Sequence, residues 1–223
     1  MNVKITCLKF HLALLHVNLS PEHNLVLTEE RKLKCIERLK NIKISYMPKK
    51  ETLKDAAVLV PLCIVNDQLS LLYTLRSSEL KRNRRQASFP GGVKDLSDGN
   101  IETTAIREAE EELGIDRQIV DIWGHGNPII GTEYSVWPVL GFLGKLDLNK
   151  LKPNPSEVEF PFTLSIKHLC DPHNIGYTKF RNLKNGYILP VYLNGTCRVW
   201  GITALITHIV LSAWLPDRYK NIL

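Results

Sequence analysis

Hydrophobic residues recur at helical spacing in two separate parts of the chain. After Thr28, a residue type that commonly begins helices, they fall three residues apart at Leu33, Ile36, Leu39 and Ile42. This pattern predicts an amphipathic helix over Glu29–Asn41. The run at 202–214 is largely apolar, contains His208, and is shorter than the roughly 20 residues that cross a membrane. It therefore predicts a buried C-terminal helix.

Runs of residues that favour extended backbone predict several strands. Four of them cover residues 56–65, 69–76, 118–124 and 136–144. Only Asn66, Asp67 and Gln68 separate the first two, which therefore predict a hairpin. After a proline-containing loop at 151–155, the segment 162–169 leads into a short helix or strand.

The segment 107–115 places several carboxylates on one surface of an expected helix. Glu108, Glu111 and Glu112 stand three and four residues apart, so they project from neighbouring points of one face. The opposite face carries an apolar stripe at steps of four, formed by Ile101, Ala105, Ala109 and Leu113. Gly114 stands where a helix C-terminus commonly needs a left-handed residue. Mg²⁺ prefers such oxygen ligands, together with water and substrate phosphate.

With the preceding Phe89-Pro90-Gly91-Gly92, this segment resembles the Nudix box, whose second half reads Arg-Glu-apolar-any-Glu-Glu-any-Gly-apolar. Residues 107–115 match that half at every specified position. In the first half, counting forward from Gly92 puts Asp98 at the usual glutamate position, and the loop is one residue longer. A longer loop of this kind is similar to that of the coenzyme A diphosphatase branch of the Nudix hydrolases.

Further blocks extend the resemblance over roughly residues 56–215. The run 71–77, Leu-Leu-Tyr-Thr-Leu-Arg-Ser, looks like the upstream signature of that branch. Blocks similar to those of animal mitochondrial coenzyme A diphosphatases lie at residues 176–178, 189–193 and 198–204. One position departs from the signature: Arg85 replaces a glycine, which leaves the conformation of the loop 81–88 open.

The resemblance implies an α/β fold, the Nudix-type α/β/α sandwich with a mixed β-sheet; the pattern of elements alone gives only α+β or α/β. We expect a Nudix domain over residues 51–223, after an N-terminal extension over residues 1–50 that contains one helix. The 223 residues, 44% of them hydrophobic, can bury one sizeable core.

The resemblance also implies an activity, the hydrolysis of the diphosphate linkage of coenzyme A or acyl-coenzyme A. The products are 4′-phosphopantetheine, or its acyl form, and adenosine 3′,5′-bisphosphate. The cofactor implied is Mg²⁺ or Mn²⁺, and its predicted ligands are Glu108, Glu111, Glu112 and the backbone of Gly92. The predicted catalytic residues are Glu111, Glu112, Arg107 and Asp98. Arg107 is expected to hold a helix carboxylate in place, and the general base stays open between Glu112, Asp98 and the downstream Glu157.

Substrate contacts are expected from the strand end and the basic loop that precede the box. The residues predicted to bind substrate are Arg76, Lys81, Arg84, Arg85, Phe89 and Gly91. The four cations between Lys81 and Arg85 suit a clamp for the 3′-phosphate and diphosphate, and a solvated basic loop is an equal alternative. Tyr177 and Trp200 are candidates for stacking on adenine, with core packing as the alternative.

Two other functional classes compete with a coenzyme A diphosphatase. One is a Nudix hydrolase for another nucleoside diphosphate, such as ADP-ribose, NADH or capped RNA; the block at 71–77 argues against it. The other is a non-catalytic nucleotide-binding Nudix module, which would be expected to lack box carboxylates. Those carboxylates are present.

Composition adds expectations about partners and compartment. The net charge of +6 suits a polyanionic small molecule, and we expect neither nucleic acid nor membrane as a partner; the oligomeric state stays open. The five cysteines show no paired spacing, which favours a reducing compartment over disulfides or zinc. Residues 1–21 lack acidic side chains and resemble a mitochondrial targeting segment, with a cytoplasmic location as the alternative.

Overall fold

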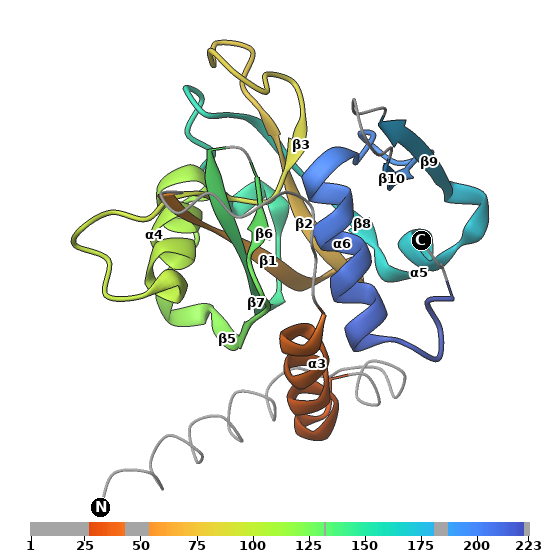
Figure 1. Cartoon of the computed structure of the whole chain (residues 1–223). Coiled ribbons are helices and arrows are strands. Elements are labelled where there is room, and N and C mark those ends of the chain that lie inside the picture. Colours follow the sequence, from red (N-terminus) through yellow and green to blue (C-terminus); the bar gives the residue numbers. More distant parts are fainter. Residues whose placement is uncertain (1–26, 43–53, 132, 181–186, 221–223) are drawn as a thin grey trace, which may run out of the picture.

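A mixed β-sheet forms the centre of the fold (Figure 1). The computed structural model describes residues 27–42, 54–131, 133–180 and 187–220. The strands of this sheet are β1 (Lys54–Val65), β2 (Gln68–Arg76), β3 (Ala87–Ser88), β4 (Gly91–Val93), β5 (Asp121–His125), β6 (Ile129–Ile130), β7 (Tyr134–Lys145) and β8 (Val158–Ser165). Their order is β3-β2-β1-β7-β5, with β4 paired to β1, β6 to β7 and β8 to β2. The sheet is mixed because β1 and β7 run parallel while the other pairs are antiparallel.

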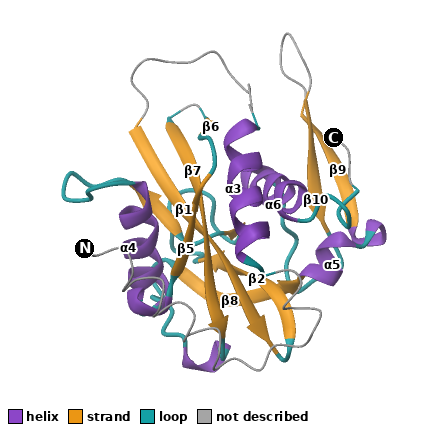
Figure 2. Cartoon of the chain, turned by 90° about the horizontal axis from the view of Figure 1, so that it is seen from below, coloured by secondary structure: helices purple, strands orange, loops and turns teal. Residues whose placement is uncertain are grey.

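Helices cover both faces of this sheet (Figure 2). Helix α4 (Ile101–Leu113) packs on one face, and α3 (Glu29–Asn41) and α6 (Gly201–Trp214) pack on the other. Alternate residues of β1 explain the two cores, since Ala57 and Leu59 face the α4 side while Val60 and Leu62 face the opposite side. The predicted α/β/α sandwich with a mixed sheet is confirmed.

Helix α3 has the predicted bounds and packs directly against the body of the fold. The hydroxyl of Thr28 accepts a hydrogen bond from the Arg31 amide and caps its first turn. Its buried side chains are Cys35, Ile36 and Leu39. The guanidinium of Arg38 donates to the carbonyl of Ala213 at the end of α6, 3.0 Å away. Although we expected this helix in an N-terminal extension, it forms part of the core beside α6.

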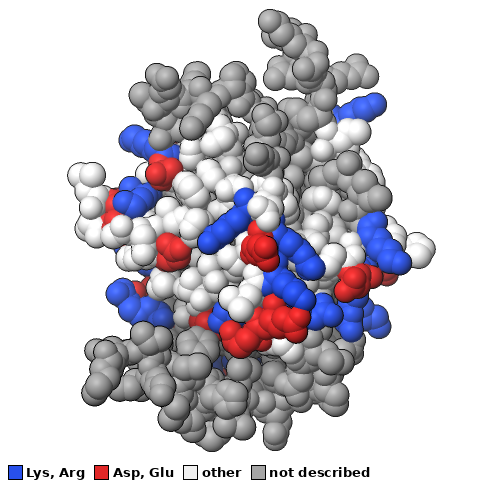
Figure 3. All heavy atoms as spheres, turned by 60° about the horizontal axis from the view of Figure 1, so that its bottom comes forward, with Lys and Arg blue, Asp and Glu red and all other residues white. Residues whose placement is uncertain are grey.

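The outer surface of α3 is polar. Lys34 pairs with Glu30 one turn earlier, at 2.5 Å, and both side chains are exposed. Figure 3 brings the bottom of the molecule in Figure 1 forward and shows acidic and basic side chains intermixed on this face. Exposed pairs of this kind contribute at most about 1 kcal/mol each, so the buried face of α3 provides its attachment.

The β1–β2 hairpin is confirmed, and two other predicted boundaries shift. Its loop is Asn66-Asp67, both with positive φ (49° and 56°), as tight hairpin turns require. The predicted strand 118–124 begins later, at Asp121, because the preceding residues form the short 3-10 helix Arg117–Ile119. The segment 162–169 contains both alternatives, the end of β8 and the short helix α5 (Ile166–Cys170).

A second, two-stranded sheet lies beside α6 and completes the fold. It consists of β9 (Ile175–Phe180) and β10 (Tyr187–Tyr192), and the remaining 3-10 helices are Leu148–Lys150 and Pro172–Asn174. Tyr177 is 51% exposed, and Trp200 lies under the guanidinium of Arg198 at 5.2 Å. Within the described ranges, no helix has the length and apolar character needed to cross a membrane. The four described cysteines are free thiols, and Cys7 lies outside the described residues.

Candidate active site around the carboxylate helix

Two glycines of β4 allow this strand to lie close both to β1 and to α4. Gly91 pairs with Val58 and Gly92 with Ala57 in an antiparallel ladder. A Cβ atom at Gly91 would collide with the carbonyl oxygen of Ala57, and one at Gly92 would collide with the carboxylate of Glu108. Glycine is therefore required at position 91, and a side chain at position 92 would displace the Glu108 carboxylate, which lies directly over the strand.

Both ends of helix α4 are capped, and its C-terminal end lies at Gly114 as the sequence predicts. The side chain of Asn100 accepts a hydrogen bond from the amide of Thr103 at 2.8 Å. Gly114 ends the helix in the left-handed region, with φ 67°. The apolar stripe of the helix faces the sheet, and the Glu108 carboxylate lies against Gly92 of β4.

Glu112 is the most buried of the helix carboxylates, with 4% of the residue exposed. Burial disfavours its charged form and raises its pKa to about 8; the charge of Arg76 and a hydrogen bond from the Gly91 backbone oppose this shift. The neighbouring charges of Glu108 and Glu157 raise the pKa further. A strongly shifted carboxyl group of this kind, close to other acids, is typical of functional sites.

Glu108 and Glu111 share one donor. The Nη1 of Arg107 donates to Glu108 at 2.9 Å and to Glu111 at 3.0 Å. The Glu108 side chain is 14% exposed, and its pKa is raised mainly by burial, whereas the Glu111 side chain is 54% exposed. Arg107 therefore bonds two helix carboxylates, where we expected it to hold one.

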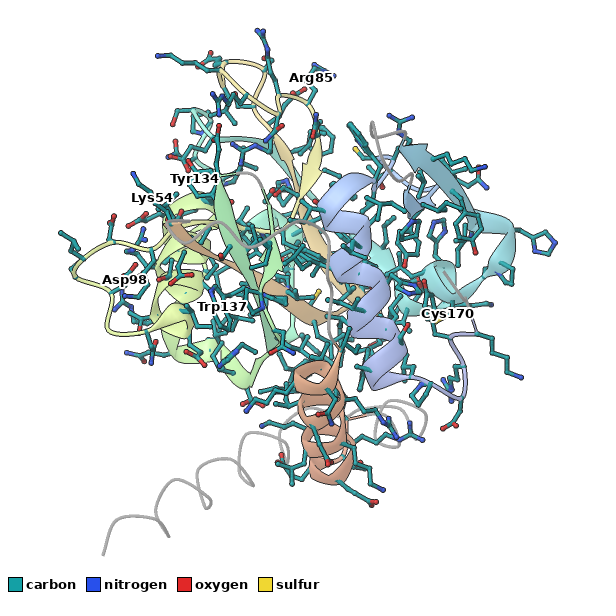
Figure 4. The ribbon with its side chains drawn as sticks, in the orientation of Figure 1. Lys54, Arg85, Asp98, Tyr134, Trp137 and Cys170 are labelled. Carbon is teal, nitrogen blue, oxygen red and sulfur yellow. The ribbon has the colours of Figure 1, made fainter. Side chains whose placement is uncertain are left out.

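Asp98 lies on the loop that leads into α4 (Figure 4) and faces Arg107 from the other side. Its carboxylate accepts hydrogen bonds from Nε and Nη2 of Arg107 and from the hydroxyl of Thr104. The bonds from Arg107, the largest of these influences, hold the pKa of Asp98 well below its usual range. A carboxylate with both oxygens bonded and a depressed pKa is a weak base, so the geometry gives Asp98 a positioning role in place of the catalytic one we expected.

Thr104 is a site residue that sequence reasoning missed. It is fully buried on the sheet-facing side of α4, where a polar side chain needs a partner. In the sequence, Thr104 stands directly before Ala105 of the apolar stripe and six residues after Asp98. This position could have indicated a buried threonine that needs a partner.

The structure brings the predicted downstream carboxylate to the helix. Glu157 lies just before β8, and its charge acts on both Glu108 and Glu112. Arg76 ends β2 on the same side, and its charge acts on Glu112. Among the described residues, the Nε of Arg76 is buried and has no hydrogen-bond partner. Buried donors of this kind are rare unless a ligand or water satisfies them.

The chemistry of this donor set fits a hard divalent cation. Its oxygen donors are the carboxylates of Glu108, Glu111, Glu112 and Glu157. In the described part of the chain, no three acidic, histidine or cysteine side chains already converge on one ion position. Instead, Arg107 holds Glu108 and Glu111. The bare Cα of Gly92 leaves room for the Glu108 carboxylate.

Arg85 adopts the backbone conformation for which a glycine is more usual. Its φ is 55°, and its amide donates to the carbonyl of Arg76 at 3.0 Å. Its side chain pairs with Glu159 at 3.2 Å and lies well away from Asp98 in Figure 4. The structure therefore does not bring the Arg85 side chain to the carboxylates.

The other cations of this loop divide into paired and exposed groups. Arg82 donates to both carboxylate oxygens of Glu133 at 2.9 and 2.8 Å. Lys81 and Arg84 are exposed, and no ion pair to either is found among the described residues. These two side chains remain the candidates for an anion clamp.

Phe89, predicted to bind substrate, is part of the core. It is 2% exposed and stacks on Tyr73 with ring centroids 4.7 Å apart. The structure therefore gives Phe89 a packing role in the core.

Comparisons with known proteins identify the family of this chain. A family model described as the NUDIX domain matches residues 53–182. The mouse mitochondrial coenzyme A diphosphatase NUDT8 is 45% identical over 168 residues, which cover 74% of this chain and 80% of that protein. Nudix hydrolase 3 of Caenorhabditis elegans is 33% identical over 215 residues, covering 86% and 88%. Among solved structures, a MutT/nudix family protein from Enterococcus faecalis has a TM-score of 0.47 and 14% identity, covering 82% of this chain and 73% of that one.

Proposed function

This chain belongs to the Nudix family, and on that basis we propose that it hydrolyses the diphosphate linkage of coenzyme A. The observation that carries the proposal is the group of carboxylates Glu108, Glu112 and Glu157, whose charges act on one another; the charge of Arg76 acts on Glu112, and Glu108 lies against Gly92 of β4. Two relatives named as mitochondrial coenzyme A diphosphatases, from mouse and human, share 45% identity with this chain. The names of these relatives support coenzyme A as the substrate. The group of carboxylates supports hydrolysis of its diphosphate linkage.

Glu108, Glu111 and Glu112, with the backbone of Gly92, would hold Mg²⁺ or Mn²⁺. Such an ion offsets the charge of a diphosphate and lowers the pKa of a bound water. Arg107 keeps Glu108 and Glu111 oriented, and Asp98 keeps Arg107 in place. These bonds keep two of the proposed ligand side chains close to the site before a cation binds.

The general base is Glu112 or Glu157. Both belong to the group of interacting carboxylates in which we place the cation, and each could accept a proton from a bound water. Asp98 is a poor base because its pKa is depressed and Arg107 and Thr104 occupy its oxygens.

Arg76 binds the diphosphate. Its buried Nε lacks a partner in the described part of the protein, and an anionic phosphate oxygen would satisfy it. Lys81 and Arg84, on the loop that begins next to Arg76, are placed to add contacts to the 3′-phosphate.

Comparison of specificity constants tests the proposed substrate. With Mg²⁺ and Mn²⁺ in parallel, we expect kcat/KM for coenzyme A to exceed that for ADP-ribose and NADH by at least about tenfold, or ~1.4 kcal/mol in transition-state binding. Equal values would leave general Nudix chemistry standing but would remove the coenzyme A specificity. Activity with capped RNA alone would favour the alternative class of Nudix hydrolase.

We further propose that the protein acts in mitochondria. The acid-free stretch before residue 22 and the names of the mouse and human relatives support this location. A fusion of residues 1–45 to a fluorescent reporter should co-localise with a mitochondrial marker. A diffuse cytosolic signal from this fusion would contradict the proposal.

A further inference from the structure

The loop between the 3-10 helix Leu148–Lys150 and β8 runs past the C-terminal end of the carboxylate helix α4. The amide of Lys152 donates to the carbonyl of Leu113, and the amide of Asn154 donates to the carbonyl of Glu112, both at 2.9 Å. The last carbonyls of a helix have no partners within the helix, so this loop satisfies two of them. Asn154 is thereby tied to the backbone of Glu112 itself.

Asn154 also organises the turn that follows. Its side-chain Oδ1 accepts from the amide of Ser156 at 3.2 Å and from the Ser156 hydroxyl at 2.8 Å. Its carbonyl accepts from the amides of Glu157 and Val158 at 3.0 and 2.8 Å. An asparagine that bonds the backbone two residues later stabilises a tight turn, here with Pro155 inside it.

The turn delivers Glu157 to the site with its backbone held at both ends. The amide of Glu157 is bonded to Asn154, and its carbonyl accepts from the amide of Ser77 at 2.8 Å, next to Arg76. The charge of its carboxylate acts on Glu108 and Glu112. Among the described residues, the side-chain hydrogen bonds found in this turn are the two to Asn154 Oδ1, so we expect the position of this charge to depend on them.

We propose that Asn154 is a positioning residue that holds the Glu157 carboxylate beside the helix carboxylates and so raises the affinity of the site for a divalent cation. This inference rests on the proposed function, because it takes the carboxylate group to be a cation site. Asn154 itself touches neither cation nor substrate in this account.

The affinity for Mn²⁺, measured by electron paramagnetic resonance of free Mn²⁺, tests the inference without any substrate. Asn154→Ala should weaken Mn²⁺ binding by about tenfold, the lower end of the effect of losing a residue that orients a ligand. Asn154→Asp keeps a side-chain oxygen for Ser156 and should restore most of the affinity. Asp147→Ala is the matched control, because Asp147 caps the neighbouring turn at Asn149 in the same way. It should leave the affinity unchanged.

A double-mutant cycle with Glu157→Gln separates positioning from a general loss of structure. If Asn154 acts through Glu157, Asn154→Ala should cause no further loss of Mn²⁺ affinity once Glu157 is changed. Independent, additive losses would overturn the inference, as would unchanged affinity in Asn154→Ala. Should the wild-type protein bind Mn²⁺ but fail to hydrolyse coenzyme A, the proposed substrate would fail while this cycle would still decide the role of Asn154.

Discussion

The guanidinium of Arg107 and the carboxylate of Asp98 are joined by two hydrogen bonds, from Nε to Oδ1 at 3.1 Å and from Nη2 to Oδ2 at 3.0 Å. This two-point attachment leaves Nη1 of Arg107 for Glu108 and Glu111. The loop before α4 therefore controls the orientation of carboxylates on the helix through one side chain.

Replacement of Arg107 by lysine should retain the charge but lose this geometry. An ammonium group cannot bond Asp98 at two points while also holding two glutamates. We expect Arg107→Lys to lower kcat by at least about tenfold, the order seen when residues that orient metal ligands are lost. Arg117→Lys is the control, because Arg117 pairs with Glu110 on the exposed side of the same helix. Steady-state rates equal to those of this control would contradict the positioning role.

The buried carboxyl group of Glu112 should lower the free energy of unfolding of the metal-free protein at high pH, although the proposed activity requires it. Its pKa of about 8 in the folded chain lies above the usual 4.5, so the folded state holds a proton that the unfolded state releases between these values. Without a metal ion, the free energy of unfolding should therefore fall as the pH rises from 4.5 to about 8.

Glu112→Gln removes this ionisation. It should stabilise the metal-free protein at pH 8 and above by at least about 1 kcal/mol, with a smaller difference near pH 5. Turnover should fall at least about 10²-fold. Urea unfolding at several pH values measures the first effect, with the exposed Glu110→Gln as control. A variant less stable than wild type throughout would show that burial does not raise this pKa.

Cation binding should depend on pH through the same group. A divalent cation must displace the proton of Glu112, so the affinity for Mn²⁺ should rise by about tenfold per pH unit below the pKa and level off above pH ~8. Calorimetry in two buffers of different ionisation enthalpy would measure the released proton. Binding that is independent of pH between 6 and 8 would exclude Glu112 as a ligand.

The exposed cations Lys81 and Arg84 should discriminate between ligands that differ only in the 3′-phosphate. Changing both to alanine should weaken coenzyme A binding more than dephospho-coenzyme A binding, because only coenzyme A carries that group. Arg82→Ala is the control, since Glu133 already pairs with Arg82. Equal losses for both ligands would argue against a 3′-phosphate clamp.

Helix α3 should be required for the stability of the domain. Leu39 is 2% exposed and Leu33 is 69% exposed on the same helix. Leu39→Ala should reduce the free energy of unfolding by about 2–5 kcal/mol, whereas Leu33→Ala should change it by no more than about 0.5 kcal/mol. If Leu39→Ala lowered the free energy of unfolding no more than Leu33→Ala does, α3 would be an extension that the domain does not need for its stability.

The local features of the fold were predictable because short-range chemistry determines them. Thr28 begins α3 and Gly114 ends α4, both as expected. Asn66-Asp67 forms the expected hairpin turn. The attachment of α3 to α6 was not predictable, because it depends on contacts between residues 175 positions apart, such as Arg38 and Ala213.

The site was predictable in composition and less so in roles. The spacing of Glu108, Glu111 and Glu112 indicates a common face but not their different burial. Phe89 and Asp98 were placed among functional residues by their position in a motif, whereas their packing and hydrogen bonds depend on the tertiary structure. No sequence motif marks Asn154. The role that we propose for it follows from its contacts with α4 and Glu157.

The most direct test of the central claim is mass-spectrometric analysis of the products formed from coenzyme A in ¹⁸O-labelled water. With Mg²⁺ or Mn²⁺, a single turnover should yield 4′-phosphopantetheine and adenosine 3′,5′-bisphosphate, with ¹⁸O in only one of them, because water attacks one phosphorus of the diphosphate. Glu112→Gln, carried in parallel, should yield at least about 10²-fold less product. Intact coenzyme A after prolonged incubation of the wild-type protein with either metal ion, or products cut elsewhere in the molecule, would contradict the account.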